Sequence, residues 1–409
     1  MTLLTHNPGI PNSEIDNLRS KTVLIVPDLL GDTSVLLQRL PALERLAEFG
    51  QVSKLSTGFQ IASGVGDALD TPEALYLGMK PGQGQLRQGP LTVAALGVDP
   101  PDRSTHFHLS LMSFTDGVVR PVSSPNAQRQ TPLQISLDEQ REVMDLAKKL
   151  NTKTLTIVEG EGLDHGLVWE GLGDLRTNPA SLMDGVPIRL HLPEGDAEVL
   201  LRRFIDDSIN LLSEIEMNQI RIDEDLPPLN LLWPWGEGIR SSVPNLALRR
   251  GEPAFVLSSS MRMQGLTRLA GYRHSSRSEF GIGTNTRFAS IAEQCHACSA
   301  AIVLIEAFAA FRGASAEHQA SKFEEAVWLM KELDTHLLTP LFDRSLTHPA
   351  RICLLAPPSS PKSASPDGLS LTFETGINNK NAVPFDEVAL DDRRTPTRVL
   401  WEVIDGALT

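Results

Sequence analysis

The chain has 409 residues, of which 41% are hydrophobic, and its 37 basic and 51 acidic residues give a formal net charge of -14 at pH 7. This length and composition predict a folded protein with a large core and exclude disorder of the whole chain. The acidic balance repels nucleic acid and anionic lipid, so we expect neither as a partner. Because the N-terminus lacks a signal-peptide pattern and no run approaches the roughly 20 apolar residues that span a bilayer, the expected location is the cytoplasm.

The first strong pattern is the apolar run 23–26, which predicts a buried strand. Asp28 follows this run directly. Since ligands gather at the carboxyl ends of strands in open α/β sheets, Asp28 stands where a metal ligand or a catalytic acid would be placed. Asp32 has two interpretations, a second oxygen ligand for a divalent cation or the N-cap of the next helix, and capping is favoured.

Short apolar runs alternate with amphipathic stretches along the rest of the chain. The apolar runs predict strands at 22–26, 154–158, 229–232, 254–257, 301–305 and 352–355. Helical spacing predicts helices at 36–49, 137–150, 196–214, 286–298, 317–337 and 395–404. This alternation is typical of an α/β fold with a mostly parallel sheet.

Two segments rich in Pro and Asp, 97–102 and 223–228, have the composition of exposed connections. They predict a smaller α+β domain at 99–226 that is inserted into a core domain formed by 1–98 and 227–409.

The segment that begins at Thr71 is typical of a helix start, with Thr71 as N-cap and Pro72 at the first helical position. A hydroxyl at a helix N-terminus is also where a phosphate-accepting nucleophile would lie, because the free backbone amides stabilise the anion. Capping alone explains Thr71, and a catalytic role is the second interpretation. The spacing of Cys295 and Cys298 is that of a redox pair, but buried structural cysteines are favoured because the pair falls late in a predicted helix.

Two further segments carry polar or aromatic candidates. The segment 230–238 (NLLWPWGEG) places an aromatic loop after a predicted strand, where Trp233 and Trp235 would either wall a pocket or close a domain interface. Asp164 and His165 lie in a Gly-rich segment and are either an oriented acid–base pair or part of an exposed turn.

Eight motifs follow one another in an order known from one enzyme family. They are VPDLLGD (26–32), PALERLAEFG (41–50), DTPEALYLGMKP (70–81), RQGPLT (87–92), NQIR (218–221), NLLWPWGEG (230–238), QGLTRLAG (264–271) and the pair Thr284-Asn285. Together they resemble the motifs of the cofactor-independent phosphoglycerate mutases of the archaeal type, in the alkaline phosphatase superfamily. The resemblance implies an alkaline-phosphatase-like core, a mostly parallel sheet flanked by helices, with an inserted smaller α+β domain.

That family is an isomerase family of glycolysis, and its chemistry uses two divalent cations, manganese or zinc, and a serine that is transiently phosphorylated. The resemblance places its first metal-binding aspartate at Asp28 and its nucleophilic serine at Leu69. The first histidine of a later metal-binding segment corresponds to Leu304, and a late Asp-His pair falls at Ala356 and Pro357. These replacements would convert a metal site into apolar core.

The resemblance also implies substrate-binding positions. The family's arginine in GRGPLE corresponds to Gln88, with Arg87 beside it, and a substrate histidine corresponds to His165. Asn230 and Trp235 are the further candidates for substrate contacts.

We therefore predict a phosphoglycerate-mutase-like protein that has lost metal-dependent phosphotransfer, keeps Asp28 as a remnant and needs no cofactor. As such a pseudoenzyme it would be a binding or regulatory module for a phosphorylated small molecule or a protein partner. The alternative is an active 2,3-bisphosphoglycerate-independent phosphoglycerate mutase or a related phosphate-ester transferase. In that case Thr71 replaces the serine, and His318 or His274 helps to bind Mn or Zn. New chemistry in the same cleft is a third, weaker interpretation.

Overall fold

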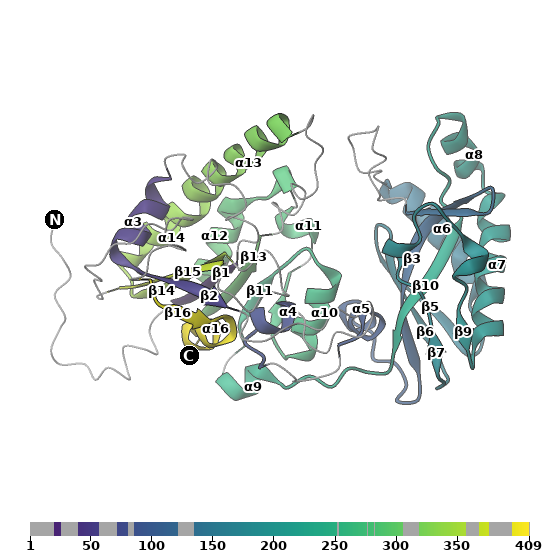
Figure 1. Ribbon diagram of the computed structural model, residues 1–409, viewed down its shortest axis with the longest axis horizontal. Coiled ribbons are helices and arrows are strands. Elements are labelled where there is room, and N and C mark those ends of the chain that lie inside the picture. Colours follow the sequence, from purple (N-terminus) through teal and green to yellow (C-terminus); the bar gives the residue numbers. More distant parts are fainter. Residues whose placement is uncertain are drawn as a thin grey trace.

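The computed structural model describes residues 20–25, 40–56, 72–80, 86–121, 135–251, 253–275, 277–281, 283–305, 319–356, 368–375 and 395–408. Two sheets lie side by side along the long axis of the molecule, and helix α5 (Gln88–Ala95) lies between them (Figure 1).

The larger sheet is mostly parallel. Within the described ranges it has eight strands, in the spatial order β12 (Arg273–His274), β11 (Phe255–Leu257), β13 (Ala300–Leu304), β1 (Ser20–Ile25), β14 (Ala350–Ala356), β15 (Gly368–Glu374), β2 (Gln51–Ser56) and β16 (Thr397–Val399). The pairs from β12 to β14 are all parallel, whereas β15 is antiparallel to both of its neighbours. The strand β1 thus lies inside the sheet, with β13 and β14 on either side.

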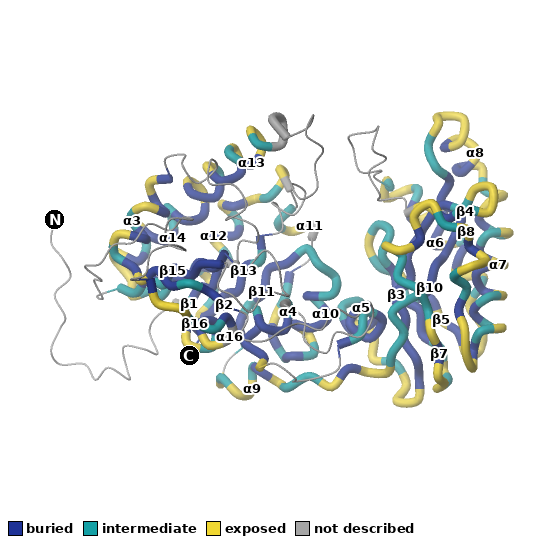
Figure 2. Tube along the Cα trace, viewed as in Figure 1, coloured by how far each residue is buried: buried dark blue, intermediate teal, exposed yellow. Residues whose placement is uncertain are grey.

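Helices cover both faces of this sheet, because successive side chains of each strand point to opposite faces. On β1, Leu24 packs into one core cluster and Val23 into the other. The first cluster is closed by α3 (Pro41–Phe49), α12 (Phe288–Ala297), α13 (Gln319–Leu333) and α14 (Thr339–Ser345). The second is closed by α4 (Pro72–Tyr76), α9 (Leu246–Arg250), α10 (Met261–Leu269) and α16 (Leu400–Leu408). The strands between them are buried (Figure 2).

A π-helical turn, Asp334–Leu338, joins α13 to α14. Although it is remote from α3 in the sequence, it caps the start of that helix. The Asp334 carboxylate accepts hydrogen bonds from the backbone N–H groups of Ala42 (3.1 Å) and Leu43 (2.8 Å). Leu40, the N-cap residue of α3, makes no side-chain cap of its own. A side chain almost 300 positions away in the sequence therefore satisfies the free amides at the start of this helix.

The smaller sheet is antiparallel. Its described strands are β5 (Leu155–Glu161), β6 (Asp164–Trp169), β3 (Thr105–Thr115), β4 (Val118–Pro121), β8 (Val186–Pro187) and β10 (Leu231–Gly238). A separate pair is formed by β7 (Leu175–Arg176) and β9 (Glu194–Gly195). One face packs on α6 (Leu137–Ala147), α7 (Glu198–Ser213) and α8 (Glu216–Asp223) through a shared apolar cluster. The division at residue 226 stays a prediction, but this sheet extends past it, because β10 pairs with β3.

Helix α5 packs closely against both neighbours because glycine stands at its two tightest contacts. A Cβ atom on Gly89 would lie 2.2 Å from the backbone oxygen of His106 on β3. A Cβ on Gly265 of α10 would lie 1.8 Å from the backbone oxygen of Leu91 on α5. Neither distance is compatible with a side chain, so these glycines permit the packing that joins the small sheet to the large one.

The other predicted elements are partly confirmed. The segment 154–158 is a strand, but it belongs to the antiparallel sheet. A short sequence pattern predicts a strand without indicating which strand it pairs with. The predicted helix 395–404 is wrong at its start, because Thr397–Val399 pair with β2 as β16 and the helix begins at Leu400. In the part of the chain that the structure describes, no helix has the length and apolar character needed to span a membrane.

Candidate functional site

Four adjacent parallel strands of the large sheet end at one edge, where an α/β protein would carry its ligands. Their last residues are Ile25 (β1), Leu257 (β11), Leu304 (β13) and Ala356 (β14). Leu257 and Ala356 are buried, and Leu304 packs against the core cluster of the second face. Leu257, Leu304 and Ala356 thus present apolar groups that do not fit a divalent cation. The described ranges contain no group of three His, Cys, Asp or Glu side chains placed to hold a metal.

The residues predicted as a metal remnant and a replacement nucleophile, Asp28 and Thr71, lie outside the described residues. So do Leu69, Pro357 and His318. The described polar side chains near this edge belong to the helices and strands that follow it.

Polar side chains converge where α5 and α10 begin, and His108 on β3 is at their centre. His108 Nε2 lies 3.1 Å from Asp164 Oδ1 on β6, the neighbouring strand. Its Nδ1 lies 2.7 Å from Thr92 Oγ1 and 3.5 Å from Gln88 Nε2, both on α5. The imidazole is 5% exposed as a side chain, so it connects the sheet to α5 in a mostly buried position.

Arg262, the second residue of α10, extends this network to the large sheet. Its guanidinium donates hydrogen bonds to Gln88 Oε1 (3.1 Å) and to the backbone oxygen of Leu86 (3.4 Å). Its Nε lies 3.8 Å from Glu73 Oε1 on α4, a long separation for an ion pair. Because α10 follows β11 directly, Arg262 stands at the carboxyl edge of the large sheet.

The end of β10 forms another wall. The Trp235 ring packs on His108 with a 4.9 Å separation of ring centroids, and its indole N–H donates to Ser110 Oγ at 2.9 Å. Two residues on, Glu237 accepts a hydrogen bond from the Thr177 hydroxyl and lies 3.8 Å from Arg87 Nη1. Burial raises the pKa of the Glu237 carboxyl, and the contacts with Thr177 and Arg87 oppose that effect.

We call the set Gln88, His108, Asp164, Trp235, Glu237 and Arg262 the α5 cluster. It combines two carboxylates, an imidazole, an arginine and an indole, with Arg87 at its rim. In this set Arg262 and Arg87 can donate charge-assisted hydrogen bonds to an anionic group, and Asp164 can orient the His108 imidazole.

The structure places the predicted substrate residues in two different roles. Arg87 and Trp235 lie at the α5 cluster. Asn230 is 5% exposed, and its side chain is paired with the Phe114 backbone, accepting from N (2.8 Å) and donating to O (3.0 Å). Asn230 therefore fixes the start of β10 against β3.

His165 lies on the opposite face of β6 from Asp164, so these neighbours form neither the acid–base pair nor the exposed turn between which the sequence left the choice open. The two residues are in a strand, where adjacent side chains alternate, and Asp164 pairs with His108 instead. His165 is fully buried, and its Nδ1 accepts a hydrogen bond from the Gly160 backbone at 3.0 Å. Burial lowers the pKa of His165 to about 4, which keeps it neutral at pH 7.

The sequence interpretation did not single out His108, Arg262 or Glu237 as site residues. The signal for His108 was present, because His106 and His108 alternate in a segment with strand pattern. Arg262 has a weaker signal, its position just after the Ser260 N-cap of a helix that follows a predicted strand. Neither pattern indicates that α5 and β3 bring them together.

The tryptophans and cysteines resolve alternatives that the sequence left open. Trp233 is fully buried and donates to the Asn178 backbone oxygen at 2.8 Å, so Trp235 alone of the two reaches the cluster. Cys295 is buried, Cys298 is half-buried and both are free thiols. Burial raises the pKa of Cys295 to about 12, which is the opposite of a redox-active thiol.

Comparison with known proteins finds similar chains at low sequence identity. No family model matches the chain. A 2,3-bisphosphoglycerate-independent phosphoglycerate mutase of Methanothrix thermoacetophila is 24% identical over 250 residues, 59% of each chain. The enzyme of the same name from Methanoculleus marisnigri is 26% identical over 251 residues, 60% of each chain. The aligned part thus spans about three-fifths of the length of these curated relatives.

Two solved structures have the same fold over almost the whole chain. The PH0037 protein from Pyrococcus horikoshii has a TM-score of 0.65 at 15% identity and covers 96% of this chain and 97% of its own. A cofactor-independent phosphoglycerate mutase from Thermoplasma acidophilum has a TM-score of 0.57 at 18% identity and covers 95% and 99%. These likenesses confirm the expected α/β fold, an alkaline-phosphatase-like core with a mostly parallel sheet.

Proposed function

Because this chain is a divergent relative of the cofactor-independent phosphoglycerate mutases, we propose that it binds a phosphorylated small carboxylic acid at the α5 cluster without metal-dependent transfer of the phosphoryl group. One observation supports this proposal most strongly. Within the described residues, several family landmarks that the chain keeps make packing contacts, whereas Gln88, Thr92, Leu304 and Ala356, which replace landmarks, stand at the α5 cluster or at the strand ends.

The kept landmarks are structural. Gly89 and Gly265 permit the close approach of α5 to its two neighbours. Asn218 and Arg221, from the NQIR motif, fasten the connection before β10. Asn218 Oδ1 accepts from Leu229 N at 2.6 Å, and Arg221 is a buried partner of Glu139 in α6. These contacts preserve a fold whatever reaction it performs.

The replaced landmarks are at the positions of chemistry. Gln88 stands where the resemblance places a substrate arginine, and Thr92 where it places a glutamate. Their uncharged side chains contact His108 Nδ1. Leu304 and Ala356 stand where the resemblance places metal ligands, and both end a strand at the carboxyl edge. Neither side chain has an oxygen, nitrogen or sulfur atom that could bind a metal ion for phosphoryl transfer.

What the cluster retains suits anion binding. Helices α5 and α10 run side by side, with Gln88 against Arg262 at their first turns, so two positive helix ends face the same region. Arg262 and Arg87 add charge there, and their carboxylate partners are each 3.8 Å away. Ion pairs of this length are weak enough for a ligand's phosphate or carboxylate to replace them.

The test is a binding measurement with 3-phosphoglycerate as the probe, by isothermal titration calorimetry with and without Mn²⁺. We expect binding that does not require the metal. Arg262→Gln should weaken it by roughly tenfold or more, the loss of one charge-assisted hydrogen bond. Arg203→Gln is the matched control, because Arg203 is an exposed arginine on α7, outside the cluster.

The names of the curated relatives favour the alternative, an active mutase, and the same samples distinguish the two. Formation of 2-phosphoglycerate is followed by phosphorus NMR with added Mn²⁺ or Zn²⁺, and metal content is measured on the purified protein. Turnover at ordinary enzyme rates that Asp28→Ala abolishes would overturn the proposal. So would stoichiometric bound metal, or binding of 3-phosphoglycerate that Arg262→Gln leaves unchanged.

A further inference from the structure

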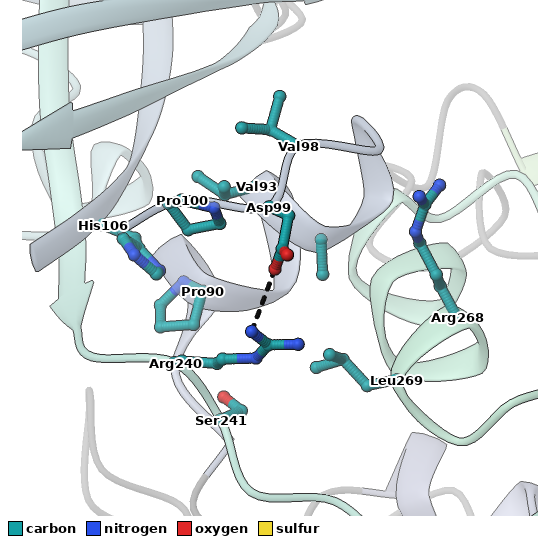
Figure 3. Close-up of a pocket in the computed structure, with 11 residues that line it drawn as sticks. Pro90, Val93, Val98, Asp99, Pro100, His106, Arg240, Ser241, Arg268 and Leu269 are labelled. Atoms are coloured by element: carbon teal, nitrogen blue, oxygen red, sulfur yellow. Dashed lines mark hydrogen bonds and ion pairs between the residues drawn. The ribbon is translucent and has the colours of Figure 1, made fainter. Parts of the chain in front are cut away.

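A pocket lies toward the other end of α5, on the side away from the carboxyl edge. Its volume is about 350 Å³, which is within the range of small-molecule sites. Two chain segments that join the sheets line it, one containing Val98 and Asp99 after α5 and the other Arg240 and Ser241 after β10, and the end of α10 closes it (Figure 3). Pro90, Val93 and Ala94 of α5 form one wall, so the pocket lies along this helix beyond Gln88 of the α5 cluster.

Two arginines give the pocket a positive charge in a protein whose net charge is -14. Arg240 Nη1 lies 2.9 Å from Asp99 Oδ1, which ties one connecting segment to the other. Arg268, on the opposite wall, donates to the Gly97 backbone oxygen at 3.4 Å. Counting both arginines and Asp99, the side chains that are charged at pH 7 sum to one positive charge. A monoanion would neutralise the site, whereas a dianion would leave it negative.

Two buried polar atoms in the wall have no hydrogen-bond partner within the described residues: His106 Nδ1 and Ser241 Oγ. Their residues are 2% and 7% exposed, and both line the pocket (Figure 3). Unpaired buried polar atoms cost free energy, so they indicate a site that a ligand or water completes.

The hydrogen-bonding roles of these two atoms differ. The Ser104 hydroxyl donates to the Pro101 backbone oxygen, so toward His106 it acts as acceptor, at 2.9 Å from Nε2. Nε2 then carries the proton, and His106 Nδ1 is left as an acceptor. Ser241 Oγ can donate. The pocket therefore offers donors to an anion and one acceptor to a hydroxyl or amine, beside apolar surface from Pro90 and Val93.

We propose that this pocket binds a small monocarboxylate that carries a hydroxyl or amine donor and an apolar body. The carboxylate pairs with Arg240 and Arg268 and accepts from Ser241. The donor group hydrogen-bonds to His106 Nδ1, and the apolar body packs on α5. Nothing in this assignment depends on the ligand proposed for the α5 cluster.

The probe is 3-phenyllactate, which has all three features, titrated into the 409-residue chain and followed by calorimetry. The comparison ligand is 3-phenylpropionate, which lacks the hydroxyl. Arg240→Gln and Arg268→Gln should each weaken binding of 3-phenyllactate by roughly tenfold. Asp99→Asn should strengthen it several-fold, because the substitution removes the competing carboxylate from Arg240. Arg203→Gln, far from the pocket on α7, should leave it unchanged.

The expected stronger binding in Asp99→Asn distinguishes this proposal from a purely structural role of the Arg240–Asp99 ion pair. In a structural role, substitution of either partner would weaken binding. Absence of 3-phenyllactate binding to the wild-type protein would overturn the proposal. Equal affinity for 3-phenylpropionate would overturn the role of His106. Loss of 3-phosphoglycerate binding in Arg262→Gln with unchanged 3-phenyllactate binding would support two independent sites.

Discussion

The buried ion pair of Arg221 and Glu139 provides the sharpest test of how the small sheet is held to its helices. Arg221 is 3% exposed, and its Nη1 lies 2.6 Å from Glu139 Oε1. Its Nε donates to the Pro227 backbone oxygen at 2.9 Å. Glu139 is 23% exposed and also accepts from Ser136 N at 2.7 Å, as half of the capping box of α6. If Arg221 is removed, the Glu139 carboxylate still accepts a hydrogen bond from Ser136 N. If Glu139 is removed, the Arg221 guanidinium keeps only the Pro227 backbone oxygen as a partner among the contacts described above.

This asymmetry sets the expected magnitudes. Glu139→Ala leaves a buried charge without its anion, which costs about 3–5 kcal/mol, and it removes a helix cap worth about 1 kcal/mol. Arg221→Met keeps most of the apolar volume and leaves a partly hydrated carboxylate, so its cost is about 1–2 kcal/mol. The double variant should be no less stable than Glu139→Ala alone, because no isolated buried charge remains.

Hydrogen exchange read by mass spectrometry on peptides that cover α8 measures this cost locally, which suits a chain of two sheets that need not unfold in one step. Glu139→Ala should lose most protection, and Arg221→Met and the double variant less. Glu198→Ala is the control, since its pair with Arg202 has both side chains 38% exposed and should contribute less than about 1 kcal/mol. Equal losses in the two single variants would refute the reasoning.

The same pair has a defined pH dependence. Burial raises the pKa of Glu139, but the hydrogen bonds from Ser136 and Arg221 outweigh it and hold the pKa below its ordinary value. The pair's contribution to stability is therefore present above the ordinary glutamate pKa and is lost as the pH falls through the lower native value. On acidification, α8 should lose more protection in the wild type than in Glu139→Gln.

Other buried groups give further outcomes. Because burial lowers the pKa of His165 from 6.5 to about 4, its contribution is complete above pH 6.5 and is lost as the pH falls toward 4. His165→Asn, which can accept the same backbone N–H, should reduce the loss of unfolding free energy over this range by up to about 3 kcal/mol in urea titrations. Burial raises the pKa of Cys295 to about 12, so a thiol reagent at pH 8 should label the half-buried Cys298 first, and mass spectrometry showing the reverse order would contradict this. Gly265→Ala places a Cβ 1.8 Å from a backbone oxygen of α5 and should cost about 1–3 kcal/mol or more in thermal melts, whereas Gly406→Ala, with nothing within 4 Å, should not.

The sequence predicted the parts of the fold that depend on local pattern. The apolar runs of β1, β13 and β14 and the amphipathic spacing of α6, α7 and α12 are strong signals, and the structure confirms these elements within two residues of the predicted ends or a little more. Helix α5 was missed because Gly89 and Pro90 weaken a short helical pattern. Its existence depends on the two surfaces that enclose it, and these come from distant parts of the chain.

The α5 cluster was predictable only in part, for the same reason. Arg87 and Trp235 were found because motif resemblance marks positions without requiring their partners. The pairing of His108 with Asp164 depends on the register of β3 against β6, in which His108 lies opposite Gly166. Register is set by packing on both faces of the sheet, which no short motif encodes.

The position of β1 within the large sheet has a consequence for synthesis. Its partners β13 and β14 pair at registers such as Lys21 with Ala300 and Ile25 with Leu355, so β1 leaves the ribosome long before its partners, which lie in the last third of this sequence. At about 5–20 residues per second this delay is on the order of tens of seconds. The small sheet, complete once Gly238 is available, can form during the wait. Nascent chains arrested before β13 should therefore contain a folded antiparallel sheet and an unpaired apolar strand. A chaperone that binds exposed apolar segments should bind this strand.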